Sequence, residues 1–284
     1  KSFRTEQLSE LVREGDQAAS VRIEVKVGPH LRQQRAAVSG KQRSLLLDGD
    51  KPETVAWYAI QTPIVVFHPG DLELASGGAT VRRTLLDRLA LFHEPSSADH
   101  RLRFQRASRE RQVLLVDRGP SASGLEVYEE LMARHGASWT AARQRASQRL
   151  LEALLPAFEK MATPGLSLEV TYRPGGSEDP EVFRRNLQER RVADARRHGP
   201  SFGPQRDEVV LSVGGRSARK HASQGQQRIL SLALKLAELE CVRAARGLHP
   251  ILLLDDVSSE LDPSRAGAVY RYLRDTPGQA FVST

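Results

Sequence analysis

Ile251–Asp256, with the sequence ILLLDD, is the stretch that decides the predicted fold. Its four apolar residues form a short continuous run, which is typical of a strand buried on both faces of a parallel sheet. Asp255 and Asp256 follow directly, so their carboxylates lie at the C-terminal end of the predicted strand. Because open α/β sheets bind their ligands at this edge, the stretch predicts an α/β fold with a ligand site beside the two carboxylates.

An apolar strand that ends in two carboxylates has the pattern of a Walker B motif. In this interpretation Asp255 holds Mg²⁺ directly or through water, and Asp256 orients or deprotonates the water that attacks a phosphate. Taken alone, such a stretch is more often an ordinary strand followed by a solvated turn. The next residues favour the nucleotide site, since Ser258–Asp262 (SSELD) precedes Pro263 and has the pattern of a D-loop, with Ser259, Glu260 and Asp262 as its site residues.

A second motif, Ser223–Gln227 (SQGQQ), precedes a run of helix-forming residues from Arg228 to Arg246. Ser223 is a good N-cap, and the start of a helix offers free N–H groups and the positive end of the helix dipole to a phosphate. Gly225 lets a phosphate approach the backbone closely. The alternative is a polar cap on a structural helix. The order of motif, helix, buried strand and acidic loop favours a phosphate-binding site made of Ser223, Gln224, Gly225 and Gln226.

Elsewhere the chain alternates between strand and helix patterns. Residues 21–27, 44–47, 64–67 and 166–172 have the apolar and polar pattern of strands. Helices are predicted around Leu85–Leu91, over 101–117 and 125–161, with the break GPSASG between the last two, and over 180–198. The apolar spacing over 101–161 does not sustain a long coiled coil, so a short helical arm is predicted.

Composition and charge limit the class of protein. The 284 residues carry a formal net charge of +7, which favours an acidic polymer as partner, and they contain one cysteine, Cys241, which rules out a disulfide framework within the chain. No stretch approaches the roughly 20 apolar residues of a membrane-spanning helix, so no membrane partner is predicted. A cytoplasmic, nucleoid-associated protein is expected.

Together these motifs resemble the RecF family of the SMC-like ABC ATPases. Ser2–Arg4 resembles the segment that follows the family's first ATPase helix, and Val65–Asp87 (VVFHPGDLELASGGATVRRTLLD) resembles its most recognisable internal stretch, continued by Phe92–Pro95. His198–Asp207 resembles the family's Gly-Pro-His-Arg-Asp loop, with Ser201–Gly203 inserted. His68 stands at the position of the Q-loop glutamine of SMC-like heads, or is a surface histidine at a strand end.

The resemblance implies an α/β ABC/SMC-like ATPase head with a mixed β-sheet lobe and a largely helical second lobe that carries a short arm. Residues 1–75 and 246–284 are assigned to ATPase lobe I, and residues 76–245 to lobe II, with the arm at 95–165 and the signature motif at 223–227. The chain contains no Walker A motif, which in the family lies upstream of the SFRT-like segment. We therefore expect the first strand, the P-loop and the first helix to precede Lys1.

In family terms the cofactors are ATP and Mg²⁺, and ATP closes a homodimer by contact with the signature motif of the opposite subunit. Many ABC ATPases carry Glu where this chain has Asp256, so slow turnover is expected. The family also implies loading of recombinase at gaps and junctions of single-stranded and duplex DNA, with RecR and RecO as partners and RecA as an indirect one. Three alternatives are a nucleotide-gated DNA clamp that needs no turnover, another SMC-like repair ATPase and a transporter ATPase subunit.

Arginines of the helical segments are the candidate contacts to DNA phosphates. Few aromatic residues accompany them, so backbone contact is favoured over base stacking. The alternative for each cluster is a solvated helix face that needs no ligand. The candidates are Arg101, Arg103, Arg106, Arg143, Arg145, Arg184, Arg185, Arg190 and Arg191.

Overall fold

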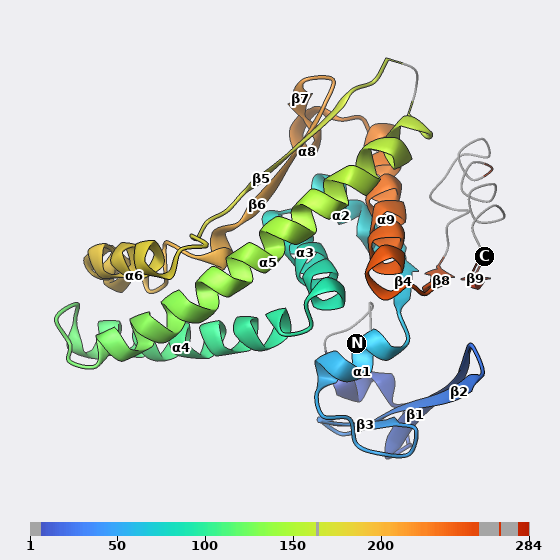
Figure 1. Ribbon diagram of the computed structural model, residues 1–284, viewed down its shortest axis with the longest axis horizontal. Helices are drawn as coiled ribbons and strands as arrows, with labels where there is room; N and C mark the ends of the chain where they lie inside the picture. The colour runs from blue at the N-terminus through green and yellow to red at the C-terminus, as the bar shows by residue number, and fades with distance from the viewer. Residues whose placement is uncertain (1–6, 163–164, 256–266, 268–277, 284) are drawn as a thin grey trace. The chain divides into compact units, whose positions relative to one another are not determined.

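A computed structural model of the protein describes residues 7–162, 165–255, 267 and 278–283 (Figure 1). The chain divides into two compact units, Lys1–Ile64 and Val65–Thr284. The predicted grouping of residues 1–75 with 246–284 in one lobe stays a prediction. Asp256 and the D-loop residues Ser259, Glu260 and Asp262 lie outside the described residues.

The first unit is an antiparallel sheet with short helices. It comprises η1 (Leu8–Leu11), β1 (Ala18–Val27), β2 (His30–Ser39), β3 (Gln42–Leu47) and α1 (Val55–Gln61), and the strand order is β1-β2-β3. Gln34, buried on β2, donates a hydrogen bond of 2.7 Å to the carbonyl oxygen of Tyr58 and so fixes α1 to the sheet. The sequence predicted β1 and β3 but not β2, whose residues lack a clear apolar alternation.

The predicted buried strand lies in the middle of a second sheet. β8 (Ile251–Leu254) pairs between β4 (Ile64–Phe67) and β9 (Ala280–Val282), and β9 runs parallel to it. Leu252 and Leu254 of β8 are buried, as are Val65 and Phe67 of β4.

Helices of the second unit pack around α9 (Gln224–Arg246), which contacts α2 (Glu73–Ser76), α3 (Ala79–His93) and α5 (Leu125–Glu159). The 3-10 helix η2 (Pro69–Leu72), which is separated from the end of β4 by His68, also contacts α9 next to α2. Apolar side chains of α9 are buried on several sides, which explains why its central part has no solvated stripe.

The predicted arm is a pair of long helices. α4 (Ser97–Arg118) and α5 pack against each other, and Figure 1 shows them as an antiparallel hairpin with α6 (Pro180–Glu189) beside the N-terminal half of α5. α7 (Arg191–Arg197) packs against α4. The core between these helices contains Phe104, Met132, Trp139, Phe183 and Leu187.

A third sheet completes the unit. β5 (Leu168–Arg173) and β6 (Glu208–Val213) pair antiparallel, and β6 continues to the short β7 (Arg216–Ser217), with η3 (Pro204–Arg206) before β6 and α8 (Ala218–His221) after β7. The sequence predicted β5 but not β6. Across the part of the chain that the structure describes, no helix is both long and apolar enough to cross a membrane.

Candidate nucleotide site

Asp255 lies where three strands of the second sheet end. Its backbone N–H donates to the carbonyl oxygen of Phe67 at 2.8 Å, and the N–H of Ser283 donates to Leu254 O at 2.8 Å. The C-terminal ends of β4, β8 and β9 therefore meet at one edge. The hydroxyl of Ser283 donates to Asp255 Oδ1 at 2.7 Å. Ser283 was missed in the sequence because only the pairing of β8 with β9 brings the last residues of the chain to this edge.

The partly exposed carboxylate of Asp255 suits a magnesium ion. Mg²⁺ prefers oxygen ligands and usually combines one or two carboxylates with waters and substrate phosphates. Among the residues that the structure describes, no group of three or more His, Cys, Asp or Glu side chains could hold a metal ion. The single carboxylate of Asp255 therefore fits a magnesium ion whose other ligands are waters and the phosphates of a nucleotide.

His68 directly follows β4 and is fixed by its neighbours. Its Nδ1 accepts from the N–H of Gly70 at 3.1 Å, and its own N–H donates to Asp71 Oδ2 at 3.0 Å, so the residue caps η2. Asp71 Oδ1 lies 3.7 Å from Nζ of the buried Lys235, and the hydroxyl of Ser231 donates to Leu72 O at 3.2 Å. The segment after β4 is thus attached to α9, the helix that begins at the signature motif.

The signature motif forms an exposed helix start. The Ser223 hydroxyl accepts from Gln226 N at 3.2 Å, and the Gln226 side chain accepts from Ser223 N at 2.9 Å, which is a capping box. Ser223 and Gln224 are exposed, whereas Gly225 and Gln226 are partly exposed. The first turn of the helix carries no acidic side chain. The N-terminus of α9 therefore presents free N–H groups and the positive end of the helix dipole to solvent.

Arg143 is wrongly predicted as a DNA contact. Its side chain is 2% exposed and forms ion pairs with Asp87 at 2.7 Å and with Asp207 at 2.9 Å. Its guanidinium also lies 4.3 Å from the centre of the Trp139 ring. Burial lowers the pKa of Arg143, but the two carboxylates outweigh that effect and raise it. A guanidinium that is buried and paired in this way has no surface left for a phosphate.

The other candidate arginines differ in exposure and in whether a carboxylate pairs with them. Arg191 is partly buried and forms ion pairs with Glu126 and Glu129. The more exposed arginines that pair with a carboxylate are Arg101 with Asp87, Arg103 with Asp99, Arg145 with Glu94, and Arg184 with Glu181 and Glu130. Arg190 lies over the Phe202 ring, and Arg106 and Arg185 are exposed. Arg106 and Arg185 are the most accessible of the set to a phosphate.

Comparisons with known proteins agree with this architecture. No family model matches the chain. The DNA replication and repair protein RecF of Anaeromyxobacter sp. (strain Fw109-5) is 38% identical over the whole chain and 79% of its own length, and that of Myxococcus xanthus (strain DK1622) is 35% identical over the whole chain and 78% of its length.

Two solved structures of the recombination mediator protein RecF superpose on the whole chain and on 79% of their own. The structure described as RecF-ATPrS has a TM-score of 0.89 at 24% identity, and the structure described as RecF-ATP has a TM-score of 0.87 at 25% identity. The chain therefore has the α/β fold of these ATP-bound RecF structures. The chain belongs to the family of the DNA replication and repair protein RecF.

Proposed function

We propose that the protein is a DNA-binding switch of recombinational repair in which ATP and Mg²⁺ close a homodimer and slow hydrolysis reopens it. The observation that carries this proposal is the exposed, capped N-terminus of α9, in a chain of a family of repair ATPases. Two subunits are needed because each nucleotide would contact Asp255 of one subunit, through Mg²⁺, and Ser223 of the other subunit.

The capping box explains how the signature motif is kept ready for a phosphate. Ser223 and Gln226 hold each other, so the first turn of α9 is ordered without a ligand. A phosphate of the nucleotide on the opposite subunit would meet the free N–H groups of Gln224 and Gly225, and Gly225 has no side chain to keep it away. Ser223, Gln224, Gly225 and Gln226 are thus the proposed contacts in trans.

On the same subunit as Asp255, the proposed roles are divided among the strand ends. Asp255 holds Mg²⁺, Asp256 orients or deprotonates the attacking water, and Ser259, Glu260 and Asp262 form the D-loop. His68 takes the Q-loop position and senses the nucleotide. A Walker A segment, as the family carries it, is proposed to hold the phosphates of the bound ATP.

Membership of the RecF family also supports a proposal about DNA and protein partners. We infer that the dimer binds duplex DNA next to a single-stranded gap, acts with RecR and RecO in the loading of RecA, and is associated with the nucleoid. Arg106 and Arg185 are the arginines proposed as phosphate contacts, since both side chains are exposed. The RecF structures that resemble the chain are themselves described as parts of the RecFOR pathway.

Sedimentation of a protein that includes the Walker A segment tests the switch. We expect its mass to double when ATP, Mg²⁺ and a gapped duplex are added. The substitution Ser223→Arg places a large cation in the proposed interface and should abolish the doubling, while leaving ATP binding by one subunit mostly intact.

Ser123→Arg is the matched control, because Ser123 is also exposed but lies in the loop between α4 and α5. It should dimerise like the parent. ATP-dependent doubling that persists in Ser223→Arg would remove the signature motif from the mechanism. A parent that stays monomeric and binds DNA equally well without ATP would favour a plain binding module.

A further inference from the structure

The ends of β8 and β9 bring a hydroxyl group next to the carboxylate of Asp255. The register of this parallel pair joins Leu254 to Val282, so Asp255 and Ser283 are the next residues on the two strands. Neighbouring strands lie about 4.8 Å apart, and side chains at corresponding positions point to the same face of the sheet. A side chain as short as serine therefore reaches the carboxylate, and the Ser283 hydroxyl donates to Asp255 Oδ1 at 2.7 Å.

Main-chain hydrogen bonds hold both residues in place at this edge of the sheet. The N–H of Asp255 donates to Phe67 O, and the N–H of Ser283 donates to Leu254 O, each at 2.8 Å. These bonds tie each residue to a neighbouring strand whatever its side chain does. The sheet therefore sets the distance between the hydroxyl and the carboxylate, and their contact exists before any ligand binds.

The hydrogen bond from Ser283 selects one orientation of the Asp255 carboxylate. The terminal torsion of an aspartate side chain has a broad energy minimum, so a carboxylate without a partner rotates easily. An ionised carboxylate can only accept hydrogen bonds, so the Ser283 hydroxyl is the donor. Within the part of the chain that the structure describes, Asp255 Oδ2 accepts no hydrogen bond. Oδ2 is therefore the oxygen that remains for a ligand.

A fixed orientation of Asp255 matters more for metal binding than for the fold. Ser283 is exposed and Asp255 is partly exposed, and substitutions at such positions usually change stability little. Mg²⁺, in contrast, requires nearly ideal octahedral geometry, so a carboxylate that holds it directly or through water has to keep its direction. Residues that orient a metal ligand typically contribute on the order of 10–100-fold to metal affinity.

We propose that Ser283 is a positioning residue of the magnesium site, which keeps Asp255 Oδ2 directed at the ion that accompanies the nucleotide. Ser283 acts through Asp255 and is not itself a ligand of the ion. This inference rests on the proposed function in that it takes Asp255 as the magnesium contact. It adds to that site a residue from β9, a strand that follows the Walker B motif in the chain.

Nucleotide affinity with and without the metal ion tests this role. A fluorescent, non-hydrolysable ATP analogue is titrated against the protein that includes the Walker A segment, once in Mg²⁺ and once in EDTA. The ratio of the two dissociation constants measures how much Mg²⁺ strengthens binding. Ser283→Ala should reduce this ratio about tenfold while the affinity in EDTA stays within about twofold of the parent. Ser283→Thr keeps the hydroxyl group and should restore the ratio.

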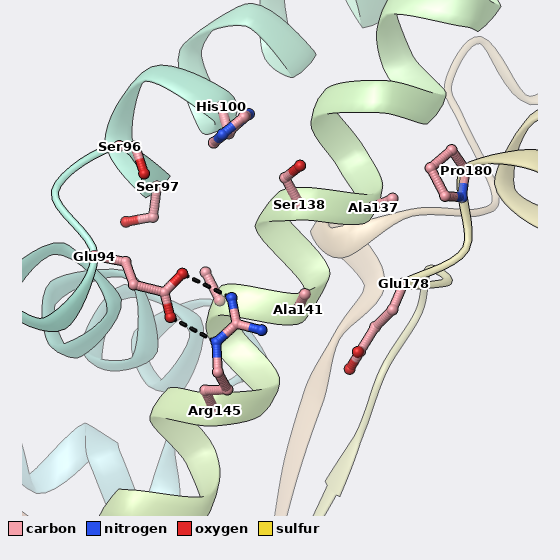
Figure 2. Close-up of a pocket in the computed structure, with 11 residues that line it drawn as sticks. Glu94, Ser96, Ser97, His100, Ala137, Ser138, Ala141, Arg145, Glu178 and Pro180 are labelled. Carbon is pink, nitrogen blue, oxygen red and sulfur yellow. Dashed lines mark hydrogen bonds and ion pairs between the residues drawn. The ribbon is translucent and has the colours of Figure 1, made fainter.

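Ser138→Ala is the matched control. The Ser138 hydroxyl also donates to an oxygen atom, Arg134 O at 3.1 Å, but Figure 2 shows Ser138 on α5, near the pair of Glu94 and Arg145. This variant should keep the Mg²⁺ dependence of the parent. The positioning role is overturned if Ser283→Ala behaves like this control, or if it weakens binding in EDTA as much as in Mg²⁺. A parent whose affinity does not depend on Mg²⁺ overturns it as well.

Ser283→Cys separates positioning from direct ligation. Thiolates prefer soft metal ions such as Cd²⁺. If the side chain at this position were a ligand, the cysteine variant would bind the analogue more tightly in Cd²⁺ than the parent does, and that result would overturn the positioning role. We expect no such gain. ATP-dependent dimerisation of the parent, followed by sedimentation, reports separately on the proposed function.

Discussion

Buried arginines set the local order of the second unit at the level of single residues. Arg143 on α5 joins Asp87 of α3 to Asp207 before β6, and Asp207 also accepts from the Tyr172 hydroxyl at 2.7 Å and from Gly175 N at 2.8 Å. A carboxylate with three donors is satisfied only while each of them is present. Burial, together with the Asp207 charge, raises the pKa of Tyr172, so this hydroxyl remains a donor.

Replacing Arg143 with Met should destabilise the protein by about 3–5 kcal/mol, because the buried charge of Asp207 would lose its ion pair and Asp87 would keep only the pair with Arg101 that the structure shows. Urea unfolding monitored by circular dichroism measures the change. Arg185→Met, at an exposed arginine of α6, should stay within about 0.5 kcal/mol of the parent. Equal stability of the two variants would show that the Arg143 ion pairs contribute no more than a surface arginine does.

At the level of elements, the contact between α5 and α6 depends on Gly136. Gly136→Ala gains about 1 kcal/mol of helix propensity, but the new Cβ atom would meet Phe183 and Phe104 and should cost more than that gain, about 1–3 kcal/mol. A lower melting temperature is therefore expected. Gly199→Ala is the control, since nothing lies within 4 Å of a Cβ atom there. A melting temperature above that of the parent would mean that α6 shifts away at no cost.

The packing of α4 on α5 should also depend on pH. His100 Nδ1 and His135 Nδ1 lie 2.9 Å apart, and burial, followed by the charge of His100, lowers the pKa of His135. The folded state therefore favours the neutral form of His135. Its contribution to the free energy of unfolding is fully present above the unfolded pKa of about 6.5 and is lost as the pH falls below that value.

Unfolding in urea at pH 7.5 and pH 5.5 measures this effect. The parent should lose stability at the lower pH, and His135→Gln should lose less of it. His221→Gln, which removes an exposed ring, should behave like the parent. An equal loss in His135→Gln and in the parent would assign the pH dependence to other groups, such as His93, whose pKa is also lowered by burial.

The elements that the sequence predicted are those with a strong local pattern. The apolar run of β8, the alternation in β1, the leucines of α3 and the N-cap of α9 indicate structure without reference to distant residues. β2 lacks such a pattern and is defined by its pairing with β1 and β3.

The role of Arg143 was wrongly predicted because it also depends on residues that are distant along the chain. Its neighbours along α5 have the composition of a solvated helix, and only Asp87 and Asp207, which are 56 and 64 residues away along the chain, make it a core residue. The site residues Ser223 and Asp255 were found because a helix cap and a strand end are local features. Their roles in nucleotide binding stay predictions.

At the scale of the whole molecule, the proposed switch and the alternative clamp differ in whether hydrolysis is required. Asp255 fits a magnesium site and the start of α9 fits a phosphate, and both are binding features that a clamp without turnover would share. Only the proposed role of Asp256 in activating water distinguishes a switch that is reset by chemistry from one that is reset by nucleotide release. The side chain of Asp256 is also shorter than the Glu found in many ABC ATPases, which is the reason that slow turnover is proposed.

Asp256→Asn in a protein with the Walker A segment separates the two mechanisms, since the amide keeps the size of the side chain but is a poor base. We expect ATP binding and dimerisation to persist, hydrolysis to fall by on the order of a hundredfold or more, and the dimer on gapped DNA to last correspondingly longer. Single-turnover hydrolysis and dissociation from labelled DNA measure both rates. Repair that remains normal in cells carrying this variant would show that turnover has no role and that the protein works as a clamp gated by nucleotide binding alone.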